Sequence, residues 1–224
     1  MNYSIRILKW FTQRDDQLFK LREAETIRRF WRAFFTLMVL TVLTYIWTAW
    51  IGLGTAPLSM NMNELSGTEY ELYKAWFIIG RIAYGLLLFV GVLLFAPLLF
   101  WIMFGLPYKK IMVIQMNVIL VMLLERITWI PLMVYVGLDW YVSPFSFGVI
   151  ASYITNIEWL IYFFGAITLF QFFIIWFQIK CLSYLSTSRK GRIITGVTLW
   201  HLTLWAGTAA LTHYDTYIVH LLTS

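Results

Sequence analysis

The amino-acid sequence predicts an all-α integral membrane protein built as a five-helix bundle. Of its 224 residues, 61% are hydrophobic and only 12% are charged, whereas an average soluble domain carries about 25% charged residues. Long, nearly uncharged apolar runs recur along the chain, and each approaches the roughly 20 residues that a helix needs to cross a bilayer. These runs lack the alternation of apolar and polar residues found in barrel strands, so helices are the expected spanning elements.

The first 32 residues are expected to form a cytoplasmic segment ahead of the first apolar run. They mix Leu18, Leu21 and Trp31 with Lys and Arg at near-helical spacing, which favours an amphipathic helix lying at the membrane interface. A plain helical extension of the first span is the alternative. Because the segment is too long and too mixed in charge for the n-region of a signal peptide, the first apolar run should remain attached as an anchor.

Five spans then make up a transmembrane domain over residues 33–211. Glycines, prolines and charged turns end the apolar runs. The expected spans cover about 33–53, 75–104, 111–136, 159–179 and 193–211, and residues 212–224 remain as a short external tail. Pro97 and Pro131 lie inside the second and third spans, and each is expected to kink its helix because proline lacks a backbone N–H.

The distribution of Lys and Arg predicts the orientation of the spans. Eight basic residues precede the first span, two lie between the second and third, and four lie between the fourth and fifth. The alternate loops contain only Lys74. Since basic residues are retained on the cytoplasmic side, the N-terminus should be cytoplasmic. The loop at 54–74 and the C-terminus should therefore lie outside, as five spans require.

Polar side chains within the spans form the candidate site. Glu125 and Arg126 are neighbours about 15 Å from the outer end of the third span, at 1.5 Å per helical residue. A charge at the bilayer centre costs about 3 kcal/mol on insertion scales, so such residues are candidates for function. The other spans bring Thr44, Gln171 and His201 to a similar depth, and Arg81 lies about one or two helical turns nearer the outside.

Helical geometry constrains how this polar cluster can pair. Successive residues diverge by about 100°, so Glu125 and Arg126 cannot both face one partner. We expect Arg81 to pair with Glu125, leaving Arg126 to Gln171, His201 or backbone carbonyls freed by proline. Such a cluster is either a clasp that fixes helix packing or part of a path for a solute or protons.

The sequence carries no recognisable catalytic site. It has no H-E-x-x-H or G-x-S-x-G motif, no glutamate pair of the intramembrane CAAX-type protease kind, and no glycine loop to cradle phosphate. His201 is the only histidine in an expected span, and the single cysteine, Cys181, lacks neighbours for a metal cluster. We therefore expect a non-enzymatic protein without cofactor or metal. The basic residues flank apolar spans, so no nucleic-acid partner is expected either.

The order of these parts resembles the YIP (Ypt-interacting-protein domain) family, in its bacterial YknW-like type. The resemblance is carried by the lead-in "RRFWRAFF", by the five spans, and by "NIEWLIYFFGAITLFQFFIIWFQIKCLSYLSTSRKGRIITGVTLW". The last segment is similar to the family's Trp-opened fourth span, Ser/Lys cytoplasmic turn and fifth span. The "DLYGP" and "GY" stretches of eukaryotic members are absent.

The resemblance implies an accessory or assembly role beside an ABC-type exporter. We accordingly expect a multi-pass protein of the bacterial plasma membrane whose partners are lipids and other integral membrane proteins. The alternative is a small-solute or ion permease that uses the polar layer around Glu125 and Arg126. An intramembrane enzyme comes third.

Overall fold

The computed structural model describes residues 2–53 and 66–223, with side chains described up to residue 214, and it is about 80% helical. The elements are β1 (Asn2–Ser4), α1 (Lys9–Thr12), α2 (Arg14–Arg22), β2 (Thr26–Arg28), α3 (Phe30–Trp50), α5 (Gly67–Val90), the π-helical turn η1 (Gly91–Phe95), α6 (Ala96–Phe104), α7 (Tyr108–Val136), the 3-10 turn η2 (Trp140–Val142), α8 (Gly148–Ile154), α9 (Glu158–Gly165), α10 (Leu169–Leu185) and α11 (Lys190–Thr223). Part of the expected external loop, residues 54–65, lies outside the described residues.

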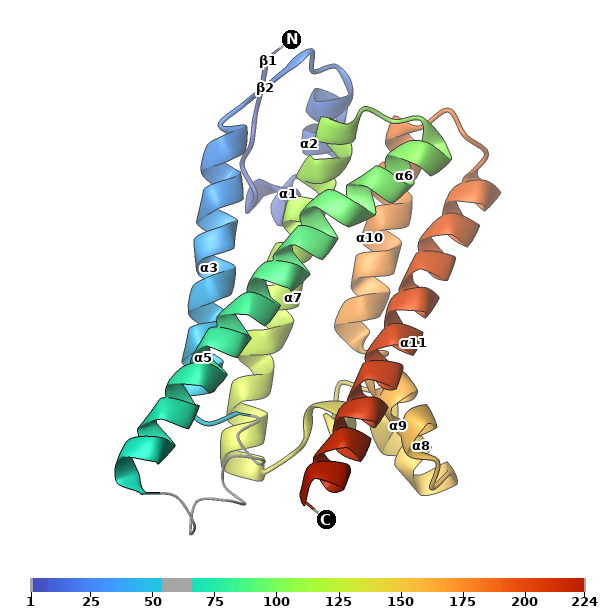
Figure 1. Cartoon of the computed structure of the whole chain (residues 1–224). Coiled ribbons are helices and arrows are strands. Elements are labelled where there is room, and N and C mark those ends of the chain that lie inside the picture. The colour runs from blue at the N-terminus through green and yellow to red at the C-terminus, as the bar shows by residue number, and fades with distance from the viewer. Residues whose placement is uncertain (1, 54–65, 224) are drawn as a thin grey trace.

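Three helices in the described part of the chain are apolar and long enough to cross a membrane. They are α3, the continuous helix from α5 through η1 to α6, and α7. The all-α class is thus confirmed, and the three helices are consistent with a membrane location. The first three expected spans match these helices within a few residues, except that α5 begins earlier at Gly67. Figure 1 shows the long helices running between two ends of the bundle, with β1 at one end and the end of α11 at the other.

The two prolines of the second and third spans occupy different helical contexts. Pro97 lies in the first turn of α6, directly after η1. A π-helical turn is a common way for a long helix to change its hydrogen-bonding register. Pro131 lies inside α7, which continues to Val136.

The expected fourth span at 159–179 is wrong as a single helix. The chain forms α9, leaves the helical conformation at residues 166–168, and starts again as α10. Helices α8 and α9 pack together at the end of the bundle opposite the N-terminal strands (Figure 1). The interruption is stabilised because its backbone groups bond to a second non-helical segment, described below.

The expected fifth span at 193–211 lies within a longer helix. Helix α11 runs from Lys190 to Thr223, so most of the expected tail at 212–224 continues this helix. Helix α11 packs against α9 and α10.

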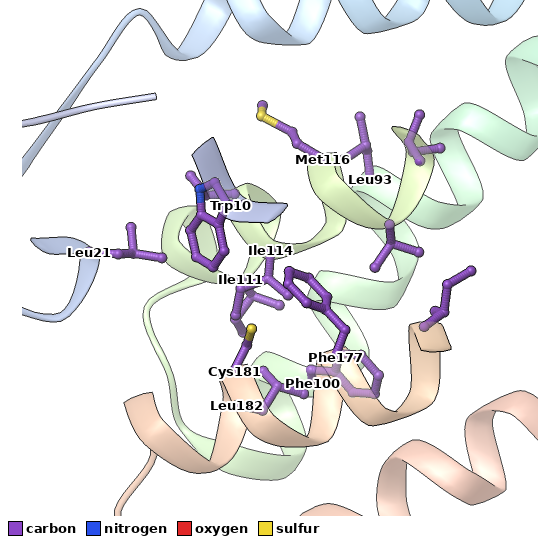
Figure 2. Close-up of a cluster of buried hydrophobic side chains, with 14 of the residues drawn as sticks. Trp10, Leu21, Leu93, Phe100, Ile111, Ile114, Met116, Phe177, Cys181 and Leu182 are labelled. Carbon is purple, nitrogen blue, oxygen red and sulfur yellow. The ribbon is translucent and has the colours of Figure 1, made fainter. Parts of the chain in front are cut away.

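The expected single amphipathic helix over residues 1–32 does not form. This segment forms two short helices, α1 and α2, and its strands β1 and β2 pair in parallel. Trp10, Leu18 and Leu21 are almost fully buried in the bundle core. Figure 2 shows Trp10 and Leu21 beside core residues of α7 and α10, and the Trp10 ring meets Phe177 edge-on at 5.9 Å. Burying these large apolar groups in the bundle stabilises the segment more than exposing them at an interface would.

Helix α7 lies at the centre of the fold. Every residue from Ile111 to Ile119 is buried, so this stretch of the helix is covered on all sides. Helix α7 contacts α3, α6, η1 and α10. Gln115 and Asn117, the polar residues of the buried stretch, therefore face other helices.

Candidate functional site

The first buried polar group of the site is the Glu125 cluster, formed by Glu125, Thr168 and Gln171. Glu125 projects from α7 and is 6% exposed. Thr168 Oγ1 donates a hydrogen bond of 2.5 Å to Glu125 Oε1. Gln171 Nε2 donates one of 3.4 Å to Glu125 Oε2. Both carboxyl oxygens of Glu125 therefore accept from the segment that begins α10.

Thr168 occupies this position because it caps the start of α10. Its backbone is extended, and Thr168 Oγ1 also accepts a hydrogen bond of 3.2 Å from the backbone N–H of Gln171. The sequence T-L-F-Q fits the S/T-x-x-E/Q pattern of a helix start. The positive end of the α10 dipole thus faces the Glu125 carboxyl group, which favours negative charge there.

The break before α10 pairs with a second non-helical segment, at residues 143–147. The backbone N–H of Phe147 donates to the carbonyl of Ile167 at 3.1 Å, and that of Leu169 donates to Phe145 at 3.0 Å. Ser146 and Thr168 form an antiparallel bridge. These bonds satisfy backbone groups beside the buried residues Ser146 and Thr168, where an unpaired polar group is costly.

Two glycines allow the chain to pack closely around this break. A side-chain Cβ on Gly148 would lie 1.8 Å from the carbonyl oxygen of Tyr141, and one on Gly165 would lie 2.6 Å from Tyr141 Cβ. Only glycine fits at such separations without movement of the backbone. The segment from η2 to α9 therefore forms a tightly packed support for Thr168.

Arg126 points to a different region of the bundle from Glu125, as successive helical residues must. Its guanidinium carbon lies 5.2 Å from the ring centroid of Tyr45 and 5.7 Å from that of Trp129. Within the described part of the chain, Arg126 Nε is buried without a hydrogen-bond partner. Cation–π contacts with the two rings stabilise the charge.

The expected ion pair between Arg81 and Glu125 is wrong. Arg81 Nη2 donates to the carbonyl oxygen of Leu53 at 3.3 Å, and its guanidinium lies 4.9 Å from the Phe77 ring centroid. Glu125 has Thr168 and Gln171 as its hydrogen-bond partners instead. Arg81 points towards the end of α3, where helix carbonyls favour a positive charge.

The second buried polar group is the glutamine–histidine chain, formed by Gln115, Gln178 and His201. Gln178 Nε2 donates to Gln115 Oε1 at 3.0 Å, and His201 Nε2 lies 2.9 Å from Gln178 Oε1. All three side chains are at most 3% exposed. They join α7, α10 and α11, with His201 Nε2 in the tautomer that donates to the amide oxygen.

The sequence placed Gln171 and His201 in one polar layer, whereas the structure assigns them to two separate groups. Gln171 and Gln178 are seven residues apart on α10, or about 10 Å along the helix. Thr44 joins neither group through its hydroxyl, which donates to Leu40 of its own helix. An estimate of membrane depth along each span could not show that Gln171 and His201 belong to two different groups.

Three residues of these groups, Thr168, Gln115 and Gln178, were not predicted from the sequence. Thr168 was detectable from the T-L-F-Q capping pattern, which lies inside an otherwise apolar run. The two glutamines were detectable as uncharged polar residues within apolar spans, which commonly hydrogen-bond across membrane helices.

Chemically, both groups contain hydrogen-bonding side chains rather than a set of metal ligands. No group of three or more His, Cys, Asp or Glu suited to a metal ion occurs among the described residues. Cys181 is buried in the hydrophobic core. The arrangement can hold helices together, and the Glu125 carboxyl group can hold or release a proton.

Comparisons of the chain with protein-family models, with curated proteins and with solved structures gave no match.

Proposed function

We propose that this chain is a non-enzymatic, multi-pass protein that binds other membrane proteins as an accessory or assembly subunit of a transport complex of the ABC-exporter type. The observation that carries the proposal is the closure of the Glu125 cluster within the bundle. Both carboxyl oxygens of Glu125 bond to the start of α10. Because its hydrogen bonds are made within the bundle, the Glu125 cluster holds helices together and binds no outside ligand. The outer surface of the bundle would then bind the partner protein.

The outward faces of α3 and α5 support a binding role. They expose large aromatic side chains, among them Trp31, Trp47 and Trp50 of α3 and Trp76 of α5. Exposed apolar surface of this kind suits lipid chains or the helices of a partner. The order of parts, which is similar to the bacterial YIP family, favours a partner protein.

We further propose five spans in a bacterial plasma membrane, with the N-terminus cytoplasmic and the C-terminus outside. Helices α10 and α11 would be the fourth and fifth spans. The strong bias of Lys and Arg to the segments at one end of the bundle supports this orientation.

A second candidate function is a small-solute or proton permease. It is favoured by one specific observation, the interrupted helix at Thr168 beside the Glu125 carboxyl group. Many secondary transporters place their binding sites at broken helices near the bilayer midplane. In this case, Glu125 would exchange its bond to Thr168 for a transported proton or solute.

Two experiments separate these functions. Chemical crosslinking in native membranes followed by affinity purification should recover an ATP-driven exporter with the wild-type chain, and also with a Glu125→Gln variant that still folds. The purified chain in liposomes should transport neither protons nor solutes. Transport that disappears in folded Glu125→Gln protein would instead establish the permease.

A further inference from the structure

We propose that the groove between α2 and α10 binds the headgroup of an anionic phospholipid. This groove has a volume of about 530 Å³. Helix α2 and the C-terminal part of α10, which line it, lie at the end of the bundle that carries the N-terminal strands (Figure 1). The inference concerns a lipid ligand and is independent of the proposed transport partner.

Helix α10 lines the groove with a row of aromatic and basic side chains. Trp176, Lys180 and Tyr184 recur every four residues, and therefore lie along one face of the helix. Trp and Tyr are typical of the membrane–water interface, where one end of the ring is apolar and the other contacts water. Their separation of eight residues spans about 12 Å of helix, which covers the depth of a lipid headgroup region.

The charge at the groove is complementary to a phosphate. Lys180 and Lys190 both line it and both are exposed. Arg14 and Lys180 flank the Trp176 ring, at 4.9 Å and 5.6 Å from its centroid. Arg22 lies 5.5 Å from the ring centroid of Tyr184. Basic pockets between membrane helices on the cytoplasmic side are a recurring site for anionic headgroups.

One acidic residue lies at the groove, and it is already partly compensated. In the described part of the chain, Asp15 is the only acidic residue that lines the groove. Its carboxylate is 3.2 Å from Arg14 Nε and is largely exposed. The positive charge of the two lysines therefore exceeds the negative charge of Asp15 among the residues that line the groove.

The groove also contains a free hydrogen-bonding group and an apolar wall. Ser183 Oγ is buried and has no hydrogen-bond partner among the described residues, although Ser183 lines the groove. A headgroup oxygen can accept a hydrogen bond from this hydroxyl. Ile179, which is half-buried, supplies apolar surface beside it for the first part of an acyl chain. Charge, hydrogen bonding and apolar contact thus match the three parts of an anionic phospholipid.

The test is a lipid titration of the purified full chain in detergent, followed by native mass spectrometry. The probes are dioleoylphosphatidylglycerol, dioleoylphosphatidylcholine and glycerol 3-phosphate. We expect phosphatidylglycerol to bind at least about 10-fold more tightly than phosphatidylcholine. Equal binding of the two lipids would show that the groove selects only acyl chains, and binding of glycerol 3-phosphate as tight as the lipid would show a free-phosphate site. Either result overturns the proposal.

The matched variants are Lys180→Gln/Lys190→Gln and the control Lys9→Gln/Lys109→Gln. Each pair removes two positive charges from the same end of the bundle, but Lys9 and Lys109 do not line the groove. At about 1 kcal/mol per lysine, or about 5-fold each, the first pair should weaken phosphatidylglycerol binding about 25-fold. The control pair should weaken it less than about 3-fold. Equal losses in the two pairs would mean that binding follows net charge and would overturn the site.

A gain-of-binding variant keeps the test independent of misfolding. Asp15→Asn removes the acidic group of the groove and releases Arg14 from its ion pair. Phosphatidylglycerol should then bind about 5-fold more tightly. Unchanged or weaker binding in this variant would contradict the proposed headgroup position.

Discussion

Thr168 makes three polar contacts with one short side chain and its backbone. Its hydroxyl donates to Glu125 and accepts from the Gln171 backbone, while its backbone takes part in the bridge to Ser146. It therefore connects α7, α10 and the segment before α8. A buried carboxyl group deprived of such a donor is left with an unsatisfied acceptor, which costs about 1–3 kcal/mol.

A double-mutant cycle on Thr168 and Glu125 tests this clasp. Thr168→Val and Glu125→Gln should each lower the free energy of unfolding in detergent. The double variant should be more stable than the sum of the two losses predicts, by about 1 kcal/mol, because contacting residues are energetically coupled. Thr208→Val is the control, since Thr208 is exposed and its hydroxyl bonds only to Leu204 of its own helix; its effect should stay below about 0.5 kcal/mol. Strictly additive losses at Thr168 and Glu125 would show that no clasp contributes to stability.

Tyr3 gives the N-terminal segment a dependence on alkaline pH. Its hydroxyl accepts from Trp10 Nε1 at 2.9 Å and donates to Gln17 Oε1 at 3.2 Å. Burial raises the pKa of Tyr3 from 10.0 to about 12, and the nearby charge of Asp16 adds to this rise. Because the folded state favours the neutral phenol, its contribution to stability is full below pH 10 and is lost as the pH rises from 10 to 12.

We therefore expect the wild-type melting temperature to fall more steeply between pH 10 and pH 12 than that of Tyr3→Phe. Melting can be followed by the fluorescence of Trp10 and the other tryptophans in detergent. Tyr153→Phe is the control, since Tyr153 is 88% exposed. It should keep the steep wild-type slope. A Tyr3→Phe slope equal to wild type would mean that the phenol does not titrate with folding.

At the scale of elements, the structure replaces one expected span with two helices and a paired break. Helix α9 ends against the η2 segment, and α10 starts at Thr168. The turn is possible because Gly148 and Gly165 let backbone segments approach without a side chain between them. The packing of these glycines determines where the polar start of α10 meets α7.

Adding one methyl group at Gly148 tests this packing. In Gly148→Ala, the new Cβ would meet the Tyr141 carbonyl at 1.8 Å, so the backbone must move. We expect a loss of about 1–3 kcal/mol in the free energy of unfolding, as for overpacked cores, with faster proteolysis of the α8–α9 turn. Gly207→Ala in α11 is the matched control, because a Cβ there meets nothing within 4 Å. It should leave stability unchanged or raise it by up to about 1 kcal/mol. Equal effects of the two changes would rule out the close approach at Gly148.

For the whole molecule, the basic residues gather at the end of the bundle that carries the N-terminal segment. Lys110 Nζ donates to the Arg22 carbonyl at 2.6 Å, which ties the first turn of α7 to the end of α2. The N-terminal segment is thereby attached to the bundle both by its apolar core residues and at its charged surface. This end contains the groove proposed for an anionic lipid.

Cysteine labelling in intact cells tests the orientation of the whole chain. Single cysteines at Glu71 and Thr187 are placed in a Cys181→Ala background, since both positions are exposed and Cys181 is buried. Glu71 is chosen over Ser66 because Ser66 belongs to the capping box of α5. A membrane-impermeant maleimide should label only Glu71→Cys, and both after permeabilisation. Labelling of Thr187→Cys in intact cells would reverse the proposed orientation.

The sequence by itself determined the helical membrane class, the three long apolar helices and the candidate status of Glu125. These properties follow from composition, run length and the cost of a charge in lipid, all of which are local. Hydropathy could not reveal the break at residues 166–168, because Gly165, Ala166 and Ile167 keep the run apolar. The capping pattern at Thr168 was its one local signal.

Only the tertiary structure decided which polar groups meet and where the first 32 residues lie. The partner of Glu125 depends on the rotation and relative depth of α7 and α10, and these are set by packing at Gly148 and Gly165 rather than by periodicity. Trp10 enters the core because α7 and α10 together offer an apolar surface that no local pattern describes. Contacts between distant segments depend on the shape of the assembled surfaces. Charge and spacing therefore predicted Arg81 as the partner of Glu125, whereas in the fold its partners are Thr168 and Gln171.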